Sequence, residues 1–180
     1  MTLQRKTPLR AKSPLQRKSY LKSKQKSKKE KSKFEISEIK KRTKGFKSVS
    51  SLEKKLDRIF SRYIRLRDTK PYDFRYGKCI SCGRVLPYDK LDCGHFHSRI
   101  HRNTRYDEDN CHCECHYCNR MSADHLIKYQ ENLIKKIGQQ RFDLLKVKAS
   151  MTCKRTAFEL ELMIKEYEKK VKELEKGMEK

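Results

Sequence analysis

The sequence predicts a small α+β protein, with a zinc-stabilised core that is flanked by helices and preceded by a disordered basic arm. Three observations lead to this prediction. Two Cys-x2-Cys pairs enclose a segment that is rich in Cys, His, Gly and Tyr. Apolar residues recur at helical spacing on both sides of that segment. Residues 1–33 are basic and of low complexity.

The charge of the chain indicates a polyanionic partner. Its 180 residues carry a formal net charge of +24, and one domain with extensions is expected at this length. Nucleic acid and an anionic membrane surface are the partners that such a charge favours. No apolar run approaches the roughly 18 residues that span a bilayer, and the N-terminus lacks the apolar stretch of a secretory signal. We therefore expect a cytoplasmic protein without a membrane partner, whose closely spaced cysteines bind metal rather than form disulfides.

Residues 1–33 are expected to be disordered. They contain thirteen Lys and Arg residues and one acid, Glu30, with too few apolar residues to offset the entropy of ordering. Two interpretations stay open, a solubilising tail and an arm that follows phosphates. In the second, favoured interpretation, Lys12, Arg17 and Lys18 contact DNA phosphates and add affinity without sequence preference.

Helical periodicity predicts the elements around the core. Helices are expected at about 51–68, 122–137, 139–148 and 154–177. Ser50 or Ser51 is expected to cap the first, and Gly138 to end the second. The last helix either packs on the body or pairs with another copy, and its expected apolar face consists of Phe158, Leu162, Tyr167, Val171 and Leu174.

Short strand-like runs mark the region between the helices. Val85-Leu86 and the run from Leu91 to Phe96 are expected to form a twisted hairpin. An isolated hairpin is marginal in water, so a metal is expected to hold this region together. The chain is accordingly divided into a basic arm at 1–33, an N-terminal helical segment at 34–71, a zinc-containing core at 72–138 and C-terminal helices at 139–180.

Four cysteines have the spacing of a structural zinc site. Two Cys-x2-Cys turns that meet supply four thiolates and leave no open position on a tetrahedral ion. We assign that site to Cys79, Cys82, Cys115 and Cys118. Cys113 is close enough in sequence to replace Cys115. Cys93 and Cys111 either form a second site with His112 or His97, or serve as small buried apolar groups.

A histidine and an asparagine accompany this zinc site. His95 follows Gly94 between the two cysteine pairs, and Asn119 directly follows Cys118 at the expected start of a helix. Zinc would therefore bring the end of a strand that carries an imidazole to the start of a helix that carries a carboxamide. We expect a cleft between this strand end and this helix start. The cleft would suit a phosphate, because a helix N-terminus also favours anions.

The pattern resembles two related groups of phage proteins. Cys-x2-Cys, Gly-His, Asn and a second Cys-x2-Cys followed by Asn resemble an HNH (ββα-metal) nuclease, similar to phage endonuclease VII. The wider pattern resembles the lambdoid phage NinG (Rap) family of recombination proteins over nearly the whole chain. It includes the runs Cys93-Gly94-His95-Phe96-His97-Ser98-Arg99 and Arg105-Tyr106-Asp107-Glu108-Asp109-Asn110.

The resemblance implies an HNH-like core and a structure-specific endonuclease that cuts branched DNA, including Holliday junctions and D-loops, in the host-cell cytoplasm. His95 would be the general base, and Asn119 a ligand of one Mg²⁺ or Mn²⁺ ion at the scissile phosphate. Asn110 would hold the loop that orients His95. The DNA phosphates would be contacted by Arg99, Arg102 and Arg105.

Two positions depart from the HNH pattern: Asn119 replaces the third His of the HNH name, and Gly94 replaces an Asp. Many HNH enzymes have a metal-binding Asp immediately before the base, where this chain has Gly94. Asp92 is the first choice for the missing ligand, and the alternatives are His97, Asp107 and His125. A non-catalytic zinc protein that binds or anneals nucleic acid is the alternative function. Coordinated junction cutting favours a homodimer, with the last helix as its seam.

Overall fold

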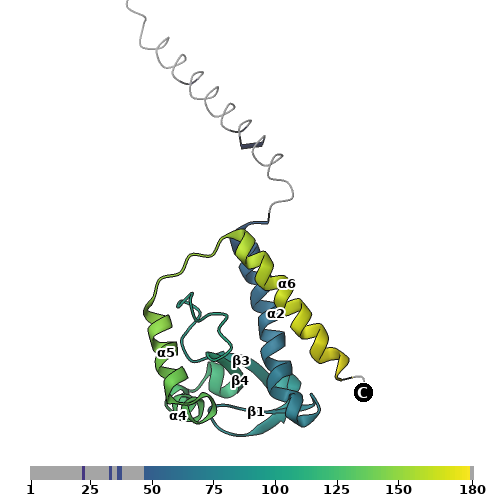
Figure 1. Cartoon of the computed structure of the whole chain (residues 1–180), viewed down its shortest axis with the longest axis vertical. Coiled ribbons are helices and arrows are strands. Elements are labelled where there is room, and N and C mark those ends of the chain that lie inside the picture. Colours follow the sequence, from purple (N-terminus) through teal and green to yellow (C-terminus); the bar gives the residue numbers. More distant parts are fainter. Residues whose placement is uncertain (1–21, 23–32, 34–35, 38–46, 179–180) are drawn as a thin grey trace, which may run out of the picture. The chain divides into compact units, whose positions relative to one another are not determined.

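Two long helices lie side by side in the computed structural model (Figure 1), which describes residues 22, 33, 36–37 and 47–178. The first helix is α2 (Val49–Thr69) and the second is α6 (Ala157–Lys176). Most of the arm predicted at 1–33, including Lys12, Arg17 and Lys18, lies outside the described residues.

The helix α2 confirms the prediction for residues 51–68. It begins two residues earlier, and its N-cap is Ser48 rather than Ser50 or Ser51: the Ser48 side chain accepts a hydrogen bond from the backbone N–H of Ser51 at 3.2 Å. Its buried side chains recur at intervals of three or four residues, so that one face is covered by the rest of the protein. They include Leu52, Leu56, Phe60 and Ile64.

The helix α6 begins with a capping box formed by Thr156 and Glu159. It packs on α2, so one of its faces is covered by the body of this chain, which is the first of the two expected arrangements. The predicted apolar face is only partly right. Phe158 and Leu162 are 69% and 49% exposed, because the helix turns a neighbouring stripe inward. That stripe consists of Leu160, Ile164, Tyr167 and Val171.

Three aromatic rings join these helices to the loop between residues 96 and 110. The ring of Phe60 meets Tyr106 edge-on at a centroid distance of 5.7 Å and Tyr167 at 4.9 Å. All three side chains are nearly fully buried. Edge-to-face pairs of this kind stabilise beyond their area burial, so the loop is anchored to both helices.

The strands pair differently from the prediction. The hairpin predicted between Val85-Leu86 and the run from Leu91 to Phe96 is wrong. Instead, β1 (Tyr76–Lys78) pairs with β2 (Val85–Pro87), and β3 (Leu91–His95) pairs antiparallel with β4 (Cys111–Cys115). A 3₁₀ turn at Tyr88–Lys90 separates the two sheets. The strand β4 is buried at all five positions, so it has none of the alternation that reveals a strand in a sequence.

Three shorter helices follow β4. They are α3 (His116–Arg120), α4 (His125–Ile137) and α5 (Gln139–Ser150). The last two confirm the predicted helices, with Gly138 between them at a φ of 82°. None of the helices in the described ranges is long and apolar enough to cross a membrane.

The sheet of β3 and β4 lies between α2 on one side and α4 with α5 on the other (Figure 1). On the α4 side, the hydroxyl of Tyr129 donates to the carbonyl oxygens of Gly94 and Asn110, both at 3.2 Å. Tyr129 is fully buried with Leu133, Phe142 and Leu145. This second apolar cluster therefore holds the two ends of the loop between β3 and β4 together.

Candidate functional site

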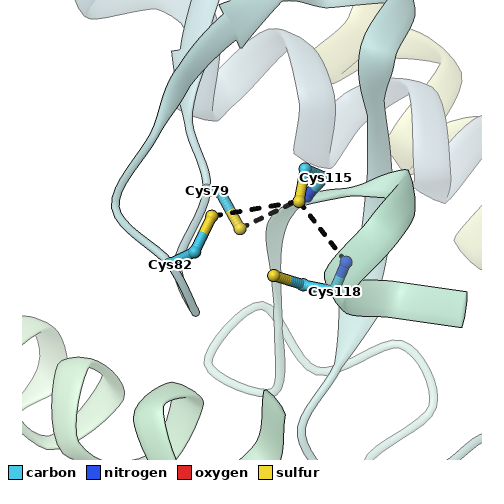
Figure 2. A group of neighbouring side chains, drawn as sticks. All are labelled: Cys79, Cys82, Cys115 and Cys118. Carbon is cyan, nitrogen blue, oxygen red and sulfur yellow. Dashed lines mark hydrogen bonds between the residues drawn. The ribbon is translucent and has the colours of Figure 1, made fainter. Parts of the chain in front are cut away.

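The four cysteines assigned to zinc converge at one point (Figure 2). Their sulfur atoms all lie within 4.8 Å of one another, and the sulfurs of Cys82 and Cys115 are 3.9 Å apart. A tetrahedral zinc ion with Zn–S bonds of about 2.3 Å places its sulfurs about 3.8 Å apart. Cys79, Cys82, Cys115 and Cys118 can thus hold a structural metal ion such as zinc.

Backbone hydrogen bonds shape both halves of this four-cysteine centre. In the first turn, Gly83 adopts a φ of 74° and donates its N–H to the Cys79 carbonyl at 2.9 Å. In the second, the N–H of Cys118 donates to the sulfur of Cys115 at 3.4 Å. The N–H of Cys115 donates across to the sulfur of Cys79 at 3.3 Å. Such bonds stabilise thiolates, the form in which cysteine binds metal.

Arg84 supplies positive charge to the same centre. Its guanidinium lies 3.4 Å from the sulfur of Cys82 and 3.7 Å from that of Cys115. Burial acts to raise the pKa of Cys82, but the hydrogen bonds from Arg84 outweigh it and lower that pKa to about 6. Four thiolates exceed the charge of a divalent ion, and Arg84 offsets part of that excess.

A cavity of about 380 Å³ lies next to the four-cysteine centre and collects most of the predicted catalytic residues. Asp92 and His95 reach it from β3, and Asn119 reaches it from α3, so residues 27 positions apart line one space. We call it the β3–α3 cavity. Its lining consists of Asp57, Phe60, Ser61, Asp92, Cys93, His95, Arg99, Asn119 and Arg120.

Asp92 is the centre of polar contacts in the β3–α3 cavity. One of its carboxylate oxygens accepts hydrogen bonds from the Asn119 amide at 3.0 Å and from Arg120 Nε at 2.9 Å. Burial acts to raise the pKa of Asp92, but these two donors outweigh it and the pKa is lowered. The carboxylate is therefore ionised at neutral pH.

His116 is a further neighbour of this carboxylate that was not among the predicted site residues. Its Nδ1 atom lies 3.0 Å from the same Asp92 oxygen. The signal was available in the sequence, because His116 and Asn119 are three residues apart and share one side of a helix that begins there. Three of the cavity's lining residues, Asp57, Phe60 and Ser61, come from α2, and no local pattern in the sequence places them at this site.

His95 is held as a neutral imidazole. Its Nε2 atom lies 3.1 Å from the carbonyl oxygen of Arg105, and with Nε2 as the donor the lone pair is on Nδ1. Burial lowers the pKa of His95 below its ordinary value of 6.5, and the positive charge of Arg99 acts in the same direction. Near neutral pH this side chain is able to accept a proton.

Asn110 closes the loop that follows His95. Its side chain is fully buried. The side-chain oxygen accepts from the N–H of His97 at 2.7 Å, and the amide donates to the carbonyls of His97 and Thr104, both at 2.9 Å. Asn110 is not among the residues that line the cavity. Its contacts are those of a positioning residue.

Gly94 stands before His95 because a buried carboxylate fills the space beside it. A Cβ atom at Gly94 would lie 2.3 Å from a side-chain oxygen of Glu114 and 2.8 Å from its Cβ. The other Glu114 oxygen accepts from Ser81 at 2.5 Å and lies 2.7 Å from Nδ1 of His125. An Asp at position 94, as in many HNH enzymes, has no room here.

The alternatives to Asp92 as a metal ligand are engaged elsewhere. His125 contacts Glu114, and Asp107 accepts a hydrogen bond from Lys148 at 2.7 Å. Neither these two residues nor His97 line the β3–α3 cavity. Of the four candidates named from the sequence, the structure brings only Asp92 to His95 and Asn119.

The three arginines predicted to contact phosphates differ in their surroundings. Arg99 is exposed and lines the cavity. The side chain of Arg102 is 49% exposed and lies 3.7 Å from Glu53. Arg105 instead forms a bidentate salt bridge with Asp57, with N···O distances of 3.0 and 2.6 Å. Because its guanidinium is already neutralised, Arg105 is a weak candidate for DNA contact.

The remaining cysteines of the core are arranged differently from the prediction. Cys113 is buried, and its thiol donates to the Arg65 carbonyl at 3.9 Å rather than joining the four-cysteine centre. Cys93 and Cys111 group with His95, not with His112 or His97. His112 was one of the two alternative partners for these cysteines, and its Nδ1 atom instead contacts Arg67 and Lys136.

Comparison with known proteins agrees with the resemblance to the phage NinG family. The chain is 34% identical over 91 residues to Protein ninG of Escherichia phage 933W, covering 50% of this chain and 42% of that protein. It is 32% identical over 123 residues to Protein ninG of Escherichia phage lambda, covering 67% and 56%. The chain therefore spans about half the length of these relatives. No solved structure matches it significantly. The family described as Bacteriophage Lambda NinG protein matches residues 4–179, and the chain belongs to this NinG family of bacteriophage proteins.

Proposed function

We propose that this protein is a metal-dependent endonuclease that hydrolyses phosphodiester bonds in branched recombination intermediates, namely Holliday junctions and D-loops. The observation that carries the proposal is the β3–α3 cavity, where a neutral imidazole, an ionised carboxylate and a carboxamide meet. His95 and Asn119 stand at the positions that the resemblance to HNH nucleases assigns, and Asp92 takes the place of the Asp that many of those enzymes have directly before the base.

His95 is the general base of the proposed reaction. Its Nε2 atom is held by the Arg105 carbonyl, so the basic lone pair is on Nδ1, which takes a proton from the attacking water. A neutral imidazole suits this role near pH 7. Arg99, exposed at the cavity, binds the scissile phosphate through charge-assisted hydrogen bonds.

Asp92 and Asn119 are the proposed ligands of a catalytic Mg²⁺ or Mn²⁺ ion. The donor set fits a hard ion, because Asp92 is ionised and the Asn119 amide presents its oxygen after a rotation about χ2. His116 is the nearest further ligand, and its nitrogen suits Mn²⁺ better than Mg²⁺. When bound, such an ion polarises the phosphate and stabilises the leaving oxygen. In the structure, the guanidinium of Arg120 balances the negative charge of Asp92.

Branched DNA and a homodimer belong to the proposal through the family resemblance. The net charge of +24 supports a polyanionic substrate. Two coordinated cuts require two active sites. If α6 is the seam, the contact uses its outer side, where Phe158 and Leu162 are exposed, because the opposite stripe is buried against α2.

The test is a cleavage assay with labelled four-way junctions, linear duplexes and single strands of matched sequence. Each substrate is incubated with the purified protein in Mg²⁺, in Mn²⁺ or in EDTA. We expect nicking of the junction with either metal, and none in EDTA. Asp92→Ala is expected to remove nicking while junction binding in EDTA persists. Tight binding without nicking in both metals would instead identify a non-catalytic zinc protein that binds or anneals nucleic acid.

A further inference from the structure

A second group of metal-binding side chains lies at the wall of the β3–α3 cavity. The sulfurs of Cys93 and Cys111 and a ring nitrogen of His95 lie within 4.8 Å of one another. The strand register explains why. His95 is directly opposite Cys111 in the sheet, and Cys93 lies two residues before His95, so all three side chains project from the same face. We call this group the Cys93–His95–Cys111 cluster.

This cluster shares no metal ligand with the four-cysteine centre or with the proposed catalytic ion, although His95 is also the proposed base. The four-cysteine centre uses Cys79, Cys82, Cys115 and Cys118, and the proposed catalytic ion uses the oxygens of Asp92 and Asn119. Two sulfurs and one imidazole nitrogen form a soft ligand set, which selects Zn²⁺ or Cd²⁺ over Mg²⁺. Three protein ligands leave the fourth tetrahedral position for water.

An ion can reach the cluster through the cavity. Cys93 and His95 both line it, whereas Cys111 is fully buried behind them. The carbonyl oxygen of Arg105 accepts from His95 at 3.1 Å and from the Cys111 thiol at 3.8 Å. A thiol is a weak donor, so an ion replaces these contacts with stronger ligand bonds.

We propose that the Cys93–His95–Cys111 cluster is an inhibitory site for a thiophilic divalent ion, with Zn²⁺ or Cd²⁺ as its occupant. The inhibitory part rests on the proposed nuclease function, in which His95 is the base. A neutral imidazole has a single basic lone pair. A metal bound to either ring nitrogen uses that lone pair and leaves a proton on the other nitrogen. His95 then has no site to accept a proton from water.

Cadmium binding tests the site without any reference to activity. The full-length chain, with its four-cysteine centre loaded, is titrated with Cd²⁺ in a non-thiol reductant, and thiolate-to-cadmium charge-transfer absorbance and bound metal are measured. Because Cd²⁺ also replaces zinc at four-cysteine sites, the wild type is expected to bind two equivalents in total. Cys93→Ser is expected to bind the second equivalent more than about tenfold more weakly. Cys153→Ser, the matched control, is expected to behave like the wild type. A wild type that binds one equivalent, or a Cys93→Ser protein that still binds two with equal affinity, overturns the proposal.

Zinc inhibition tests the consequence for the base. Junction nicking in Mg²⁺ is measured as free Zn²⁺ is raised, and each protein is compared with its own zinc-free rate. The wild type and Cys153→Ser are expected to lose nicking at a Zn²⁺ concentration more than about tenfold below that required for Cys93→Ser. Equal sensitivity of all three proteins refutes the inhibitory role. If no protein nicks under any condition, the nuclease proposal fails, and the cadmium titration still decides whether the site exists.

Discussion

The carboxamide of Asn119 donates a hydrogen bond of 3.0 Å to the carboxylate of Asp92. This contact joins the first helix after β4 to β3, and both side chains line the cavity that His95 also lines. The four-cysteine centre lies at the start of the same helix, since Cys115 is its N-cap and Cys118 directly precedes Asn119. Metal binding at the centre and the geometry of the cavity are therefore expected to depend on each other.

Removing a ligand of the four-cysteine centre should unfold the core. Structural zinc contributes on the order of 10 kcal/mol of apparent binding free energy in small domains, and the four cysteines join the turn between β1 and β2 to the start of α3. Cys82→Ser, or the wild type with excess chelator, is expected to lose zinc and its cooperative thermal transition. Metal analysis and far-UV circular dichroism measure both, with Cys153→Ser as the control. If the wild type keeps its cooperative thermal transition in excess chelator, zinc is dispensable for folding.

Replacing the proposed base should separate binding from cleavage. General-base catalysis contributes about 10²–10⁴-fold in rate, so His95→Ala is expected to nick junctions at least about 100-fold more slowly at unchanged binding affinity. His101→Ala is the control, because His101 is exposed and lies outside the β3–α3 cavity. Single-turnover nicking and gel-shift binding are compared for the three proteins. Full nicking by His95→Ala would assign the base to another group.

The pH dependence of nicking should report on the same residue. The base works when neutral, so the rate falls as the pH drops through the pKa of His95. Burial, with the charge of Arg99, holds that pKa below 6.5, and the acid limb is expected below that value. Arg99→Ala removes one of the two lowering influences, so its midpoint is expected at higher pH, whatever the loss in absolute rate. An unshifted midpoint would mean that a different group titrates.

Asp68 should govern stability in acid. Its carboxylate accepts from the N–H of Cys113 at 2.8 Å and from Arg67 at 2.9 Å, so it ties the end of α2 to β4. Burial acts to raise the pKa of Asp68, but hydrogen bonds and charges from His112 and Arg67 outweigh it and hold the pKa well below its usual range.

Because the folded pKa is depressed, the stability that Asp68 contributes is present above the unfolded pKa of about 3.9 and is lost as the pH falls below it. Asp68→Asn is expected to destabilise by about 3 kcal/mol at pH 7. Its deficit relative to the wild type is expected to shrink below about pH 4. Urea unfolding at a series of pH values measures both, and a deficit that is constant with pH would contradict the assignment.

A methyl group at position 94 should strain the sheet. The new Cβ would overlap the Glu114 side chain at 2.3 Å, and overpacking of this kind destabilises by about 1–3 kcal/mol. Gly177→Ala is the control, since its Cβ meets nothing closer than 3.2 Å. Thermal melting compares the two variants. Equal melting temperatures would show that Glu114 moves aside freely.

The extent of the helices and the four-cysteine centre could be predicted from the sequence. Both depend on spacing along the chain: apolar residues every three or four positions form one face of a helix, and each Cys-x2-Cys turn directs two sulfurs to one side. The predicted apolar face of α6 shows the limit of such patterns. Phe158 and Leu160 lie on adjacent stripes of the helix, and only the packing against α2 selects the stripe with Leu160.

The pairing of β3 with β4, and everything that depends on it, was decided by the tertiary structure. The sequence alone determined that this chain carries a zinc-type cysteine centre, an adjacent His and Asn, and long amphipathic helices. Only the fold decided that Asp92 joins His95 and Asn119, that Arg105 is neutralised by Asp57, and that Cys93 and Cys111 lie beside His95. The physical reason is that these are contacts between side chains far apart in the chain, which arise from strand register and burial rather than from local periodicity.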